Sequence, residues 1–343
     1  MEQKMNTRKA TEFNGDKIDG VPVITKLNVH DLEEGMHRFM FKGADMNIGQ
    51  SWYVPVMVAK GANPGKKLLL ITGVHGDELN GTRVIQQIFA DLDPEKLSGT
   101  VVGVVQASPN ALLHISRHWH LSTDGGGYEN MNRLFPGDAK GNTAEIHAHK
   151  LWHNLWHGNA DYVIDMHSQS TDTEYPLFIY ADYQTKGAEH LAKLFPADQL
   201  INSSGEAGTV ENTFDEQRIP AITIEIGGAR RFQPEYIERT VEGVHNVLVD
   251  LKILEGKMKR TAKEFGTFCG EDMESVCAEV GGYAEILVNI GDMVTKWQKI
   301  ALQRNPFGDE IIQYYAPMSG MVVSVGTSAT REAGGLLVRI LLD

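Results

Sequence analysis

The chain has 343 residues, of which 42% are hydrophobic and 22% are charged, and its net charge is −13 at pH 7. This composition excludes a long disordered chain, and the length suggests about two domains. The negative charge disfavours nucleic acid and anionic membranes as partners, because no run of lysine and arginine offsets it.

Cysteine content and the N-terminus indicate the compartment. Cys269 and Cys277 are too close in sequence to staple a large domain and lack a second pair for a zinc knuckle, so we expect reduced thiols. The N-terminus shows no apolar secretory segment, and no stretch approaches the roughly 18 apolar residues of a membrane helix. We therefore expect a cytoplasmic protein.

Strand and helix patterns alternate along the chain. Residues 1–20 are expected to form a polar N-terminal arm, and residues 21–60 a β-rich lead-in. Unbroken apolar runs predict buried strands at 67–73, 100–106, 160–166 and 221–226. Helical patterns follow at 82–92, 143–157 (with Thr143 as expected N-cap) and 234–255. The alternation predicts an α/β sheet with covering helices, in which ligands bind beyond the strand ends.

Two segments depart from this alternation. Residues 111–141 are irregular and rich in His, Gly and Asn, and a loop of that length is usually functional or mobile. From residue 265 to 343 the pattern changes to short alternating segments with turns, which predicts a small all-β module. The predicted domains are therefore an α/β domain at 21–264 and this module.

One set of residues suggests a metal site. His75 and Glu78 follow a buried strand in the segment GVHGDELNG, and His167 ends another strand. Two imidazoles and one carboxylate suit zinc and leave a position for water, as in catalytic sites. Taken alone, an H-x-x-E pair is more often a turn histidine and a helix cap, so the signal depends on the whole set.

Four further residues are candidates for the chemistry. Glu225 ends an apolar strand, where partial burial would raise its pKa and suit it to general acid and base catalysis. Asn132 and Arg133 suit the capture of a carboxylate, and Arg117 could polarise a carbonyl. Structural salt bridges are the competing interpretation for Glu225 and both arginines. A solvated stripe is favoured over a second metal for His149, His153 and His157.

These residues, in this order, resemble the succinylglutamate desuccinylase/aspartoacylase family, through GVHGDELNG, SPNALL, NMNRLFPG, DMHSQS and TIEIGG. The resemblance implies a zinc-carboxypeptidase-like mixed β-sheet flanked by helices, and one Zn²⁺ per chain on His75, Glu78 and His167. It also implies that Asn132 and Arg133 hold the substrate carboxylate, Arg117 stabilises the oxyanion, and Glu225 is the general base and acid.

Two features depart from the family pattern. Asn130 stands where the family usually has an acidic residue that supports a zinc histidine, so metal affinity is expected to be lower. The segment between Arg117 and Asn132 is longer than usual.

The C-terminal module resembles the barrel-sandwich of lipoyl and biotinyl carriers, but the stretch LQRNPFGDEIIQ has no lysine to modify. This favours a structural role, either in covering the mouth of the active site or in oligomerisation.

The leading hypothesis is a zinc-dependent amide hydrolase that removes an acyl group from a small N-acyl amino acid or related amine. The alternatives are a metallocarboxypeptidase acting on short peptides or peptidoglycan fragments, and a catalytically silent metal-binding or assembly protein. The expected partner is a small molecule, with a homo-oligomer left open. Neither the acyl group nor the amine can be identified from the sequence.

Overall fold

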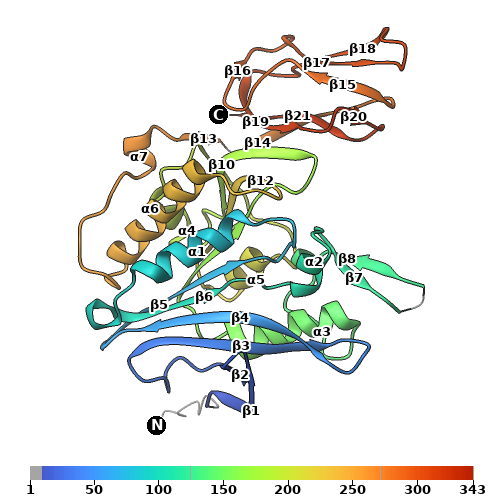
Figure 1. The fold of residues 1–343 in the computed structure, drawn as a ribbon. Coiled ribbons are helices and arrows are strands. Elements are labelled where there is room, and N and C mark those ends of the chain that lie inside the picture. The colour runs from blue at the N-terminus through green and yellow to red at the C-terminus, as the bar shows by residue number, and fades with distance from the viewer. Residues whose placement is uncertain (1–9, 124, 271, 343) are drawn as a thin grey trace.

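A mixed β-sheet with helices on both faces organises the protein (Figure 1). The computed structural model describes residues 10–123, 125–270 and 272–342. The strands of the first 230 residues are β1 (Glu12–Ile18), β2 (Val21–Lys26), β3 (Gly35–Asp45), β4 (Ser51–Lys60), β5 (Asn63–Thr72), β6 (Ser98–Val104), β7 (Trp119–Leu121), β8 (Gly127–Glu129), β9 (Tyr162–His167), β10 (Thr173–Ala181), β11 (Gln199–Asn202) and β12 (Ala221–Gly228). The helices are α1 (Asn80–Asp91), α2 (Pro109–Leu113), α3 (Thr143–Lys150), α4 (Ala188–Lys193), α5 (Val210–Glu216), α6 (Pro234–Asp250) and α7 (Ala262–Phe265).

Each face of the sheet has its own hydrophobic core. Successive side chains of a strand point to opposite faces, so Leu68 and Leu70 of β5 pack with α1, α4 and α6. Leu69 and Ile71 pack on the other face with α3, α5 and strands β2–β4. Burial on both faces explains why these strands are uninterrupted apolar runs, and it confirms the predicted α/β sheet with covering helices.

The centre of the sheet is parallel and determines where polar residues meet. Strands β6, β5, β9 and β12 are neighbours in that order, and each pair is parallel. Their carboxyl ends therefore lie at one edge, where the loops after β5, β9 and β12 converge. The segments GVHGDELNG, DMHSQS and TIEIGG all lie at this edge.

Several predicted boundaries are wrong, for local reasons. Residues 12–18 of the expected polar arm form β1, which pairs with β2 through backbone hydrogen bonds although its side chains are mostly exposed. The first helix begins at Asn80 and not at residue 82. The N-cap of α3 is Asn142, because Asn142 and Glu145 form a reciprocal capping box. The helix then continues as a π-helical turn, Leu151–Trp156, and the final helix ends at Asp250.

Strands make up the C-terminal part after α7. They are β13 (Phe268–Gly270), β14 (Asp272–Cys277), β15 (Gly282–Ile286), β16 (Met293–Val294), β17 (Lys299–Arg304), β18 (Glu310–Tyr315), β19 (Gly320–Gly326), β20 (Thr330–Arg331) and β21 (Leu336–Leu342). They enclose a separate core that includes Ile300, Val322 and Leu337. We propose that residues 265–343 are a distinct unit, here called the C-terminal β module. The main sheet passes into it because β10 pairs with β19.

Among the described residues, no helix has the length and apolarity needed to cross a bilayer.

Candidate metal centre and active site

Three potential metal ligands meet at the carboxyl edge of the parallel strands. His75 and Glu78 lie on the turn between β5 and α1, and His167 is the last residue of β9. The turn requires glycine at two positions. Gly73 has φ +73°, and a Cβ at Gly76 would lie 2.0 Å from the backbone of Ala111.

The donor atoms of these three residues face one another. One carboxylate oxygen of Glu78 lies 2.8 Å from His75 Nδ1, and the other lies 2.8 Å from His167 Nδ1. The two Nδ1 atoms are 3.3 Å apart. All three side chains are buried, and their donor atoms lie within 4.8 Å of one another.

Outer partners orient both imidazoles. His75 Nε2 lies 3.0 Å from Asn130 Oδ1, and His167 Nε2 lies 2.7 Å from Asp165 Oδ2. With each Nε2 donating to an oxygen, each Nδ1 can present a lone pair to a cation, an arrangement typical of metal-ligating histidines. Two imidazoles and a carboxylate in this geometry fit a divalent ion such as Zn²⁺.

Charge and burial act in opposite directions on these ligands. Burial lowers the pKa of His75. Burial also opposes ionisation of Glu78, but the two histidines outweigh it and hold its pKa well below the ordinary range. For His167, burial lowers the pKa, but the carboxylates of Asp165 and Glu78 outweigh burial and raise the pKa well above its ordinary value. Cation binding would therefore have to displace a proton from this cluster.

Glu225 stands beside the ligands, where β12 runs parallel to β9. In this pairing Glu225 is the register partner of His167. Burial, assisted by the negative charge of Glu78, raises the pKa of Glu225 to about 7. Its Oε2 atom is buried and has no hydrogen-bond partner among the described residues. A carboxylate in this position can accept and return a proton near neutral pH.

Arg117 reaches the same cluster from the loop after α2. Its Nη1 lies 3.2 Å from Glu78 Oε1 and 3.3 Å from His75 Nδ1. The same atom donates to Ser170 Oγ at 2.7 Å. The guanidinium therefore places a positive charge beside the candidate metal ligands.

Within the described part of the chain, Asn132 and Arg133 make no hydrogen bond to the candidate metal ligands, and Asn132 reaches them through Asn130. Asn132 is buried, its backbone N–H donates to Asn130 Oδ1, and its Oδ1 accepts from the N–H of Val210. Arg133 is more exposed and pairs with Glu206 at 2.7 Å. Asn132 is thus joined to the centre through Asn130, whereas Arg133 is held near Glu206 on the loop before α5.

Sequence reasoning missed two residues of this cluster. Asp165 and His167 are two apart on a strand, so they share a face. That D-x-H spacing could have identified the outer partner. Ser170 donates to Glu78 Oε1 at 3.0 Å and accepts from Arg117. No periodic signal marks Ser170, because it lies in the irregular loop between β9 and β10.

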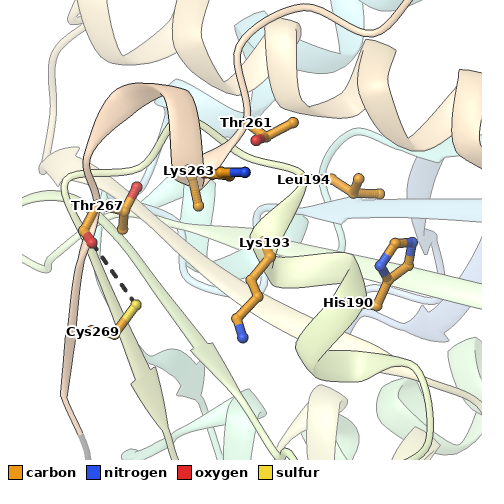
Figure 2. A pocket seen from close by; sticks show the side chains of 8 residues that line it. His190, Lys193, Leu194, Thr261, Lys263, Thr267 and Cys269 are labelled. Carbon is orange, nitrogen blue, oxygen red and sulfur yellow. Dashed lines mark hydrogen bonds between the residues drawn. The ribbon is translucent and has the colours of Figure 1, made fainter.

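His149, His153, His157 and Cys269 do not belong to the group of candidate metal ligands. The rings of His149 and His153 are 4.2 Å apart, and His157 stacks on Trp152. Among the described residues, these three histidines do not form a group whose donor atoms could hold a metal ion. A separate cavity, with a volume of about 440 Å³, shares no residue with the candidate metal centre. Figure 2 shows the side chains that line it. Cys269 lies in it, and His190 and Lys193 line it while pairing with Asp250 and Glu189.

The fold and the donor set together define an α/β protein with a candidate metal centre at the carboxyl ends of its parallel strands. Residues 64–251, more than half of the chain, match the succinylglutamate desuccinylase/aspartoacylase catalytic domain. The protein belongs to this family of enzymes, which confirms the resemblance in the sequence.

Individual relatives support the same assignment. N-alpha-acetyl-L-2,4-diaminobutyric acid deacetylase of Halomonas elongata is 29% identical over 299 residues, covering 84% of this chain and 85% of that protein. Two solved structures share the fold. The product-bound ectoine utilization protein EutE (DoeB) from Ruegeria pomeroyi has a TM-score of 0.80 at 22% identity, covering 91% of this chain and 96% of that chain. A succinylglutamate desuccinylase/aspartoacylase from Rhodobacter sphaeroides has a TM-score of 0.79 at 20% identity, covering 92% and 98%.

Proposed function

We propose that the protein is a zinc-dependent amide hydrolase that removes the acyl group from a small N-acyl amino acid. The observation that carries this proposal is the convergence of His75, Glu78 and His167, with oriented imidazoles, beside the unpartnered carboxylate oxygen of Glu225. Family membership and the name of the Halomonas relative support an N-acyl amino acid as substrate.

The residues divide the chemistry among them. When bound at His75, Glu78 and His167, Zn²⁺ supplies Lewis-acid chemistry that makes water nucleophilic near neutral pH. Glu225 takes a proton from the attacking water and returns it to the departing nitrogen. Arg117 donates hydrogen bonds to the carbonyl oxygen as negative charge develops there.

Asn132 and Arg133 orient the substrate carboxylate in this proposal. A guanidinium has five N–H donors, and two nitrogens of Arg133 already donate, one to Glu206 and one to the carbonyl of Asn132. The remaining donors can bind a carboxylate. A local cationic clamp is needed because the net charge of −13 repels an anionic substrate.

The test is metal analysis of the purified protein combined with a hydrolysis screen of N-acetyl, N-succinyl and N-formyl amino acids, including Nα-acetyl-2,4-diaminobutyrate. We expect one zinc per chain and turnover of at least one of these compounds. Bound metal with C-terminal trimming of short peptides, and no deacylation, would favour the metallocarboxypeptidase alternative. A protein without stoichiometric metal or hydrolysis would be the silent assembly protein.

A further inference from the structure

The loop between β9 and β10, residues 168–172, connects the candidate active site to the C-terminal β module. On the active-site side, Ser170 donates to Glu78 and accepts from Arg117. Thr171 donates to Asp77 through both its backbone N–H (3.1 Å) and its hydroxyl (2.9 Å). The loop is therefore fixed to the H-x-x-E turn on this side.

On the other side, the same loop is held by the C-terminal β module. The carbonyl oxygen of Asp172 accepts a hydrogen bond from the backbone N–H of Thr327 at 2.8 Å and another from the guanidinium of Arg331. Directly after Asp172, Thr173 pairs with Gly326 where β10 meets β19. The first hydrogen bonds from the module to this loop are therefore made at Asp172, only two residues after Ser170.

Arg331 is committed to this contact. Its other side-chain hydrogen bond goes to the carbonyl oxygen of Leu336 at 3.0 Å, and it forms no ion pair with a described carboxylate. Gly326 leaves room for the guanidinium, because a Cβ at that position would lie 2.5 Å from Arg331 Nη2. The guanidinium is therefore packed against the backbone and bonded to it on both sides.

Asp172 itself is in an unfavourable backbone conformation. Its φ is +79°, in the left-handed region that residues with a side chain rarely adopt. A cavity of about 280 Å³, lined in part by Thr171, Asp172 and Thr327, leaves this side of the loop loosely packed. The two hydrogen bonds from the module to the Asp172 carbonyl oxygen hold the loop at this strained residue.

We propose that Arg331 is a positioning residue of the active site: by holding Asp172 it sets the loop so that Ser170 orients Arg117 and Glu78. The C-terminal β module thereby contributes to the reaction, although none of its residues belongs to the cluster of candidate metal ligands. This inference rests on the proposed function, because it assigns a consequence to the placement of Arg117 and Glu78.

Hydrogen exchange tests the connection without any substrate. In Arg331→Met we expect amides of residues 168–173 to exchange about tenfold faster than in the wild type, in the metal-free protein. Arg331→Lys retains a donor and should restore most of the protection. Arg304→Met is the matched control, because Arg304 lies in the same module but pairs with Glu285. Unchanged exchange in Arg331→Met, or an equal effect of Arg304→Met, would overturn the proposal.

Kinetics then test the route through Ser170. We expect Arg331→Met to lower kcat about fivefold with little change in KM, and Ser170→Ala to lower it about tenfold or more. The double variant should be no slower than Ser170→Ala, because both changes act on one contact. If the two substitutions together lower kcat by the product of their separate effects, Arg331 does not act through Ser170 and the proposal is overturned. A wild-type protein that deacylates nothing overturns the proposed function, whereas the exchange experiment decides the connection by itself.

Discussion

Two buried histidines in this protein have opposite electrostatic environments. His167, at the end of β9, lies between the carboxylates of Asp165 and Glu78, which raise its pKa well above the ordinary value despite burial. His147, on α3, accepts from the N–H of Ala44 and donates to the carbonyl of Ala107. Burial lowers the pKa of His147 to about 4.

The difference shows that burial alone does not identify a functional histidine. Neutral backbone partners satisfy His147 completely, so that its ring stays uncharged and serves packing. Ionised partners around His167 make its site favour a positive charge, which a proton or a metal ion can supply. The charge of the hydrogen-bond partners, and not the degree of burial, therefore distinguishes His167 from His147.

Removing the carboxylate of Glu225, the register partner of His167 on β12, should have the largest effect on the rate of deacylation. In Glu225→Gln the side chain keeps its shape but can no longer accept a proton, so we expect kcat for deacylation to fall about a thousandfold. Zinc content, measured on the same sample, should stay near the wild-type value because Glu225 is not among the proposed ligands. Turnover within a few-fold of the wild type would contradict its role as general base.

His147→Gln tests the other region through stability. Between pH 6.5 and about 4 an unfolded histidine binds a proton that folded His147 does not, so the folded state loses stability as pH falls. The wild type should lose about 3 kcal/mol over this window that the variant does not lose. Urea unfolding at pH 7 and pH 4 measures this difference.

The comparison between variants matters because other buried groups titrate in the same window. Burial raises the pKa of Asp215 to about 7, and this group favours the folded state as pH falls. That contribution is common to both proteins and cancels. Equal pH dependence in wild type and His147→Gln would show that His147 is not the group responsible, and deacylation per folded molecule at pH 7 should be unchanged.

The features of the site that depend on position along a strand could be predicted from the sequence. Apolar runs located β5, β9 and β12, and the polar residues at their ends identified His75, Glu78, His167 and Glu225 as one set. Parallel strands bring such ends together, so the edge of the sheet could be predicted without coordinates.

The parts that depend on contacts between loops could not be predicted. Ser170 and Asp172 lie in an irregular segment, and their partners Arg117 and Arg331 are distant in sequence. β1 was missed because its pairing is made by the backbone while its side chains remain exposed. The difference between His147 and His167 likewise depends on partners from other elements, which periodicity does not reveal.

Asp165→Asn should weaken His167 as a metal ligand and so lower the affinity of the protein for the metal ion. The amide can still accept from His167 Nε2, but the negative charge is lost, so we expect metal affinity to fall about 10–100-fold. Competition with a chelator measures this change. Asp161→Asn is the matched control, because Asp161 precedes β9 and pairs with Lys67. Equal affinities in the wild type and Asp165→Asn would contradict the role of this carboxylate.

Asn130→Asp asks whether His75 can be made to resemble His167, with the smallest expected effect. Asn130 Oδ1 accepts from His75 Nε2 at 3.0 Å and from the backbone N–H of Asn132 at 3.0 Å, so a carboxylate would inherit two donors. Asn130 is only half-buried, which limits the cost of the new charge. Because a charged partner makes the imidazole a stronger donor to metal, chelator competition should show affinity rising up to about tenfold. Unchanged or weaker affinity would mean that orientation of His75, which Asn130 already provides, matters more than charge.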